Sequence, residues 1–210
     1  MSRAAVPTPT TAPPTDGRAR RRERNREAVV AALLELYREG RLQPSADEVA
    51  ERAGVSVRSV FRYFDDTEAM VRAGITRQQQ HLAPLYALEV PAGAPFTERL
   101  RRFVDARTRL LAGMGPVGRV ARALAIRQPL VEAELARIRQ RLRDQLTEVF
   151  APELATLPPA ERTAAVAAAD VASSWEAYHL MTEDQGLTPD QAADAMARAL
   201  ARLLAPGNER

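Results

Sequence analysis

The stretch "AGVSVRSVFRYF", residues 53–64, decides the fold, because its composition and its spacing favour different structures. Three valines, two phenylalanines and a tyrosine are typical of a β-strand. The alternation of a strand fails, however, since Val60 and Phe61 are adjacent and would lie on opposite faces. On a helix, Val57, Val60, Phe61 and Phe64 fall at i, i+3, i+4 and i+7, which is one face. The spacing therefore predicts a helix, with Ser56 as its N-cap.

A second short helix is predicted directly before this one, in "PSADEVAERAG", residues 44–54. Ser45 and Glu48 have the spacing of a capping box, and Gly54 supplies the positive φ that ends a helix. Two short helices joined by so tight a turn predict a helix-turn-helix, whose second helix enters the major groove of DNA. An ordinary helical hairpin within a larger bundle is the alternative interpretation.

The longer segment "PSADEVAERAGVSVRSVFRYFDDTEAM", residues 44–70, resembles the DNA-binding domain of the TetR family of bacterial transcription regulators. The resemblance rests on the hydroxyl residue that opens the first short helix, then on Ala, Gly-Val-Ser and the closing Tyr-Phe pair. It covers roughly residues 24–72 by motif. It implies a three-helix DNA-binding domain followed by a helical domain for ligand binding and dimerisation.

The same resemblance implies how the helix-turn-helix would meet DNA. Arg58 would read a guanine through a bidentate fork to O6 and N7, while Ser45 and Tyr63 would contact phosphates. Two residues depart from the family pattern, because Phe61 replaces a Tyr and Thr67 replaces a Lys. The full DNA-binding set predicted in this way is Ser45, Ser56, Val57, Arg58, Ser59, Phe61, Arg62, Tyr63 and Thr67.

Composition divides the chain into three parts. Residues 1–17 are rich in Pro, Thr and Ala, which predicts a disordered tail. Residues 18–72 form the predicted DNA-binding domain with a basic N-terminal arm, and residues 73–210 form the ligand-binding and dimerisation domain. Residues 1–26 hold seven arginines against two acids, so the arm is a candidate for contact with the DNA backbone or minor groove. A solvated tail is the alternative.

Helical periodicity continues to the end of the chain and predicts an all-α protein of about nine helices. Segments 96–112 and 117–127 are separated by glycines and a proline, and a long charged helix follows over 130–150. A further helix is expected from the prolines at 158–159 to Asp184. The last helix has Thr188 as its cap and Gln191 closing a capping box.

The family resemblance also implies a ligand pocket and a dimer interface in the second half of the chain. The predicted pocket residues are Phe103, Arg107, Met114, Arg122, Trp175, Tyr178 and His179, where Arg107 or Arg122 would suit an anionic or carbonyl-bearing ligand. The predicted homodimer interface consists of Ala165, Ala168, Ala172, Ala192, Met196, Ala199 and Leu203. Core packing within one chain is the alternative for both sets.

Composition excludes several classes of function. The chain has no Cys and only two His, far apart in sequence, so we expect no metal, no cofactor and no enzymatic activity. No apolar run approaches the ~20 residues that span a bilayer, which favours a cytoplasmic protein. The expected partners are a double-stranded DNA operator, a second copy of the chain and a small-molecule effector. Two alternatives stay open: a ligand-independent DNA-binding protein, and a small enzyme using carboxylates such as Glu132 and Glu134 or Glu176 and Glu183.

Overall fold

The computed structural model describes residues 15–205, and all regular elements in that range are helices, which confirms the predicted all-α class. Ten α-helices are joined by one 3₁₀ turn and one π-helical turn. The chain divides into two compact units. The first contains residues up to Leu36 together with Gln43–Gly74, and the second contains Tyr37–Leu42 together with the residues from Ile75 onward.

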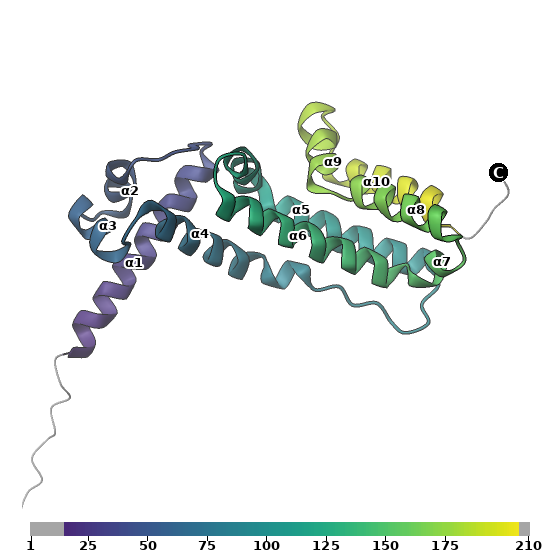
Figure 1. Ribbon diagram of the computed structural model, residues 1–210, viewed down its shortest axis with the longest axis horizontal. Helices are drawn as coiled ribbons and strands as arrows, with labels where there is room; N and C mark the ends of the chain where they lie inside the picture. The colour runs from purple at the N-terminus through teal and green to yellow at the C-terminus, as the bar shows by residue number, and fades with distance from the viewer. Residues whose placement is uncertain (1–14, 206–210) are drawn as a thin grey trace, which may run out of the picture. The chain divides into compact units, whose positions relative to one another are not determined.

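The first unit contains α1 (Thr15–Arg38), α2 (Ala46–Ala53), α3 (Val57–Tyr63) and the first half of α4 (Thr67–Leu82). Its core is built from apolar faces of these helices. Val30, Leu33 and Leu34 of α1 are buried, as are Val60 and Phe64 around α3. Figure 1 shows α2 and α3 side by side as two short helices, and they are in contact.

The caps of α2 and α3 and the turn between the two helices have the geometry that the sequence predicts. Ser45 Oγ accepts a hydrogen bond from the Glu48 amide at 3.2 Å, and the Glu48 carboxylate accepts one from the Ser45 amide at 2.8 Å. Gly54 has a left-handed φ of 66°, where a residue with a Cβ is strained. Ser56 caps α3 by accepting from the Ser59 amide at 3.2 Å. The capping box, the glycine turn and the second cap are therefore all confirmed.

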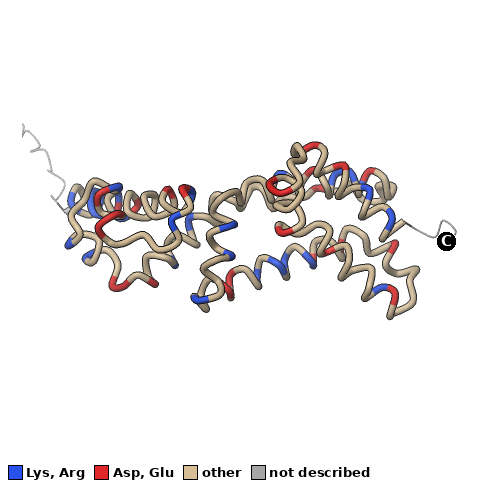
Figure 2. The backbone as a smooth tube through the Cα atoms, turned by 90° about the horizontal axis from the view of Figure 1, so that it is seen from above, with Lys and Arg blue, Asp and Glu red and all other residues tan. Residues whose placement is uncertain are grey.

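The start of the chain differs from the prediction. Helix α1 begins at Thr15, so residues 15–17 are helical, not part of a disordered tail, and residues 1–14 lie outside the described range. Of the seven arginines in residues 1–26, Arg3 lies outside the described residues and Arg26 is half-buried. The other five lie exposed on the first turns of α1. Figure 2 shows them as blue segments beside the grey N-terminal trace. They form a helical extension because Arg, Glu and Ala are good helix formers.

The second unit is a helical bundle that contains Tyr37–Leu42, the second half of α4 and the elements after it. Its elements are η1 (Ala83–Tyr86), α5 (Phe96–Ala125), α6 (Pro129–Val149), α7 (Ala151–Ala155), α8 (Pro159–Ala172), α9 (Trp175–His179), η2 (Leu180–Asp184) and α10 (Pro189–Leu204). Helix α5 packs against α6 and α10, and α8 packs against the same two helices (Figure 1). Phe103 and Phe150 meet edge to face at 5.2 Å in the core between them.

Two predicted helices have different boundaries in the structure. Segments 96–112 and 117–127 form one run, α5, which is sharply broken at Gly115 (φ 45°, ψ −144°) just before Pro116. The helix predicted over 158–184 ends at Ala172 instead. The Ser173 hydroxyl donates back to the Ala169 carbonyl at 2.8 Å, and Ser174 caps the new helix α9 by accepting from the Ala177 amide at 3.1 Å. Adjacent serines that cap and turn the chain explain this break.

A buried ion pair joins α5 to α7. The Arg99 guanidinium donates to both carboxylate oxygens of Glu153, and its Nη1 also donates to the Val149 carbonyl at 2.6 Å. The two side chains are only 11% and 6% exposed. Because both charges are desolvated, removal of one partner leaves the other uncompensated.

We therefore expect Glu153→Ala to lower the free energy of unfolding of the second unit by about 3–5 kcal/mol. Denaturant titration followed by the fluorescence of Trp175, the single tryptophan of the chain, measures this unit alone. The control is Asp105→Ala, which breaks an exposed pair with Arg101 and should cost less than about 1 kcal/mol. Equal losses in the two variants would contradict the structural role given to the buried pair.

Candidate functional site

The exposed side of α3 carries the residues expected to read DNA. Arg58 and Arg62 are one turn apart and exposed, and Phe61 beside them is 55% exposed. The prediction that Phe61 shares a face of α3 with Val60 and Phe64 is therefore wrong, because only Val60 and Phe64 are buried. An apolar ring on this surface can contact a thymine methyl group, which a buried ring cannot.

All nine residues of the predicted DNA-binding set lie in the first unit, and each is exposed or half-buried. Ser45 and Ser56 occupy the N-caps of α2 and α3. The Ser56 and Ser59 hydroxyls also lie 2.9 Å apart, within hydrogen-bond distance. The Ser45 oxygen accepts from the backbone, so its hydroxyl proton is left to donate to a phosphate.

The arginines of the helix-turn-helix and of α4 differ in their contacts with other residues of the chain. Arg52 lies 3.7 Å from Glu35 and Arg72 lies 2.6 Å from Glu68, so both are in ion pairs. Arg62 donates to the Tyr63 hydroxyl at 3.2 Å and covers its ring. Arg58 makes no hydrogen bond or ion pair with any residue in the range 15–205. Its guanidinium is therefore available to an external acceptor.

Helix α1 contributes residues to this surface that sequence reasoning missed. Asn25 Nδ2 donates to the Tyr63 hydroxyl at 3.3 Å, and Arg26 lies over the Phe64 ring at 5.1 Å. Hydrogen bonds from Asn25 and then Arg62 lower the pKa of Tyr63, and the charges of Arg62 and Arg22 act in the same direction. No local motif indicates these contacts, because 38 residues separate Asn25 from Tyr63.

The acidic residues before α4 have a structural explanation. The Asp66 carboxylate accepts a hydrogen bond from the Ala69 amide at 2.7 Å, so Asp66 caps α4. Thr67 is the exposed first residue of that helix. The Lys that the family pattern has there is thus replaced by a hydroxyl beside a capping carboxylate.

A cavity of about 270 Å³ lies in the second unit between α5, α6, α8 and α9. It is lined by Arg107, Met114, Arg122, Leu135, Ile138, Arg139, Leu142, Asp170, Val171, Ser174, Trp175 and Glu176. Three predicted pocket residues besides Trp175 line it, namely Arg107, Met114 and Arg122. Its α6 residues were missed, because they follow the ordinary pattern of an amphipathic helix.

Arg107 is the unusual residue of this cavity, because only 1% of it is exposed. Its Nη2 donates to the Leu142 carbonyl at 2.8 Å, its Nη1 donates to the Ser173 carbonyl at 3.2 Å, and its plane covers the Phe103 ring at 4.6 Å. Burial lowers the pKa of Arg107 to about 10, partly opposed by the charge of Asp170. The side chain is therefore still a cation at neutral pH.

Trp175 forms a wall of the cavity together with Arg122 and Glu176. The Arg122 guanidinium lies 4.0 Å from the Trp175 ring centroid, and its Nε donates to Glu176 at 2.7 Å. A Cβ placed on Gly118 would lie 2.9 Å from Trp175 Nε1, so only glycine lets the indole approach α5 this closely. Burial lowers the pKa of Arg122, while its bond to Glu176 acts in the opposite direction.

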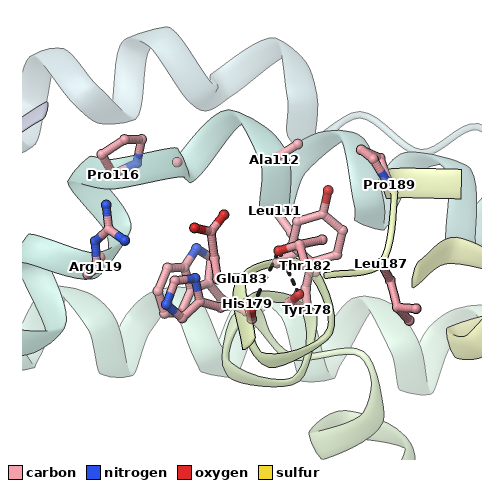
Figure 3. Close-up of a pocket in the computed structure, with 12 residues that line it drawn as sticks. Leu111, Ala112, Pro116, Arg119, Tyr178, His179, Thr182, Glu183, Leu187 and Pro189 are labelled. Carbon is pink, nitrogen blue, oxygen red and sulfur yellow. Dashed lines mark hydrogen bonds between the residues drawn. The ribbon is translucent and has the colours of Figure 1, made fainter. Parts of the chain in front are cut away.

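A second cavity, of about 390 Å³, lies between the kink of α5 and the turn formed by α9 and η2. Figure 3 shows Pro116 and Arg119 from α5 near His179 and Glu183 from the other side. Tyr178 and His179 line this cavity and Trp175 lines both, so the single predicted pocket is divided in two. Phe103 is fully buried beneath Arg107 and belongs to the core, which corrects its predicted role.

The predicted dimer residues also divide between core and surface. Ala192 and Met196 are buried in the core of their own unit, which corrects their assignment to an interface. Ala165 and Leu203 are half-buried against that core, Ala172 and Ala199 are half-buried, and Ala168 is exposed. On α8 the exposed residues Ala164, Ala167, Ala168 and Val171 form an apolar strip, in which Val171 is 68% exposed.

Two further findings concern other classes of function. Within residues 15–205 no group of three or more acidic or histidine side chains could hold a metal ion. Glu132, Glu134 and Glu176 lie in ion pairs with arginines. No helix in the same range is long and apolar enough to cross a membrane.

Comparison with known proteins agrees with this description. The sequence model of the bacterial regulatory proteins of the tetR family matches residues 29–73, which contain α2 and α3. No curated protein matches the chain.

Among solved structures, a tetR-family transcriptional regulator from Streptomyces coelicolor superposes with a TM-score of 0.64 at 22% identity. The match covers 86% of this chain and 79% of that protein. A transcriptional regulator from Rhodococcus sp. Rha1 gives a TM-score of 0.61 at 20% identity, covering 87% of this chain and 95% of that one. The resemblance seen in the sequence is therefore confirmed: residues 29–73 match the tetR-family sequence model across the helix-turn-helix, and the chain has the fold of solved tetR-family transcriptional regulators.

Proposed function

We propose that the chain is a homodimeric transcriptional repressor that binds a palindromic operator and is released from it by a small molecule. The observation that carries the proposal is the α2–turn–α3 unit, whose caps and glycine turn present Arg58 without an internal partner. A gel shift with a palindromic fragment of the chain's own promoter tests it. Failure to bind any such fragment more tightly than random DNA would overturn it.

Sequence recognition is assigned to the exposed side of α3. Arg58 lies in its first turn, where residues of a recognition helix contact base edges. A guanidinium forms two parallel hydrogen bonds to guanine O6 and N7, and Phe61 one turn further offers an apolar contact. Ser45, Tyr63 and the first turns of α1 would hold the phosphates on either side.

Dimerisation is assigned to the apolar strip of α8, together with the exposed part of α10. Ala164, Ala167, Ala168 and Val171 form one exposed apolar strip on this alanine-rich helix, and contiguous exposed apolar surface is typical of an interaction site. A second copy is the partner that a palindromic operator requires, because a two-fold site needs two recognition helices about 34–36 Å apart. The core residues Ala192 and Met196 support this surface from inside.

Ligand response is assigned to the second unit, which contains the two cavities. Helix α4 belongs to both units, since the division falls between Gly74 and Ile75. A ligand that favours one position of this helix would change the position of the recognition helices. A differential affinity of only ~1–3 kcal/mol is sufficient to change operator occupancy several-fold.

The first prediction concerns base reading by Arg58. We expect Arg58→Ala to weaken operator binding by about 1–3 kcal/mol and to relax preference at one base pair per half-site. Competition binding against single-base operator variants measures the preference. Arg52→Ala is the control, because Arg52 is paired with Glu35 and should leave the preference unchanged. An equal loss on random DNA would show that Arg58 contacts only phosphate.

The second prediction concerns the helical extension of α1. Replacing Arg18, Arg21 and Arg22 with Gln should keep the helix and flatten the slope of log K against log salt by up to ~2.7 per protomer, at ~0.9 per phosphate contact. The control removes equal charge from exposed positions in the second unit, Arg109, Arg127 and Arg137. If both triple variants have the same salt slope, the extension does not meet DNA.

The third prediction concerns the dimer surface. Ala168→Glu places a charge in the exposed apolar strip of α8 and should shift the chain from dimer to monomer. Sedimentation equilibrium measures the mass, and circular dichroism checks the fold. Ala136→Glu, at an exposed alanine of α6 outside the proposed interface, is the matched control. A dimer of unchanged stability in the first variant would place the interface elsewhere.

A further inference from the structure

We propose that the cavity around Arg107 binds a small organic monocarboxylate, with the carboxylate against Arg107 and an apolar body against the α6 side of the cavity. The proposal gives the effector site a ligand class. Its role in regulation rests on the proposed function. Binding itself is measured without DNA, so the two can fail separately.

Arg107 carries a buried positive charge that no carboxylate of the protein compensates within the described residues. Buried charges in proteins are normally paired, since an isolated cation in the interior is strongly unfavourable. The bonds of Arg107 go to neutral acceptors only: two carbonyls, the Ser173 hydroxyl at 3.5 Å and the Gln145 amide oxygen at 3.5 Å. Within the described residues no carboxylate forms an ion pair with it.

The second step is that the nearby acids are already engaged. Asp170 accepts from Arg143 Nε at 2.9 Å, and Glu176 accepts from Arg122 Nε at 2.7 Å. Glu132 lies 3.3 Å from Arg139. Arg107 is therefore the cation of this cavity that lacks an anion, and one negative charge would compensate it.

The third step is an unused donor. The Nε–H of Arg107 is fully buried and has no acceptor among the described residues. Nε and one Nη together form the side-on edge of a guanidinium that binds a carboxylate with two parallel bonds. The 3.5 Å contacts of Nη1 and Nη2 are long, so an incoming carboxylate can replace one of them.

The fourth step decides the chemical class. Leu135, Ile138, Met114 and Trp175 make the rest of the lining largely apolar, which suits a hydrocarbon or aromatic body. A volume of about 270 Å³ restricts that body to a small molecule. A phosphate ester would bring a second negative charge close to Asp170 and Glu176, so a monoanion fits better.

The experiment uses the full-length protein and the fluorescence of Trp175, which lines the cavity and is the single tryptophan. The probes are octanoate and 2-naphthoate, each with its neutral amide as a matched ligand, and inorganic phosphate. We expect saturable binding of a carboxylate, at least about 30-fold weaker binding of its amide, and no binding of phosphate. Equal binding of acid and amide, or no binding of either carboxylate, would overturn the proposal.

Two variants locate the site. Arg107→Met should weaken carboxylate binding at least about 30-fold, because it removes the buried cation while keeping an apolar side chain of similar length. Arg119→Met, which alters the second cavity, should leave carboxylate binding unchanged. The reverse result would place the ligand in the second cavity and overturn the proposal. Circular dichroism checks the fold of Arg107→Met, and the comparison of acid with amide in the unaltered protein does not depend on it.

The same samples separate this proposal from the proposed function. Carboxylate binding through Arg107 that leaves operator binding unchanged would support the site and contradict the ligand-released repressor. If another molecule releases the operator and no carboxylate binds, the carboxylate site is contradicted and the ligand-released repressor is supported.

Discussion

The left-handed turn at Gly54 is the constraint on which the recognition surface depends. Its φ of 66° ends α2, and Val55 bonds back to the Ala50 carbonyl at 3.0 Å, which sets the direction in which α3 begins. A side chain at this position would add strain at a point where only three residues join two helices. Val60 and Phe64 lie on the buried side of α3 and of its C-cap. Arg58, Phe61 and Arg62 therefore face outward on the opposite side. The proposed recognition surface therefore follows from a backbone geometry that a single glycine makes accessible.

The sequence predicted those features that arise from neighbouring residues. Caps at Ser45, Ser56 and Thr188 were predicted and are present, because each needs only a hydroxyl and an amide three residues later. The break in the helix at Ser173 was missed, because adjacent serines can also continue a helix and the bond that Arg107 donates to the Ser173 carbonyl comes from 66 residues away. The same reason explains why Phe61 was placed on the wrong face: seven residues of helix do not show which side the rest of the unit will cover.

The candidate sites divide in the same way. The DNA-binding set was predicted through its motif, while the contacts of Asn25 with Tyr63 and of Arg26 with Phe64 required the fold. Arg107 was predicted as a pocket residue only through the family resemblance. Its lack of a carboxylate partner, which gives the cavity its chemistry, depends on how Asp170 and Glu176 pair with other arginines. Pairing among distant charges has no signature in a single sequence.

We propose that carboxylate binding in the cavity of Arg107 and operator binding through α3 are coupled. Linkage requires the effect to be mutual, so operator DNA must weaken carboxylate binding by the same factor by which the carboxylate weakens operator binding. Titration of octanoate or 2-naphthoate into the protein, with and without saturating operator, measures this factor directly. We predict a several-fold lower carboxylate affinity in the presence of operator, matched by an equal loss of operator affinity in the presence of the carboxylate. Identical carboxylate affinities in the two titrations would contradict the account.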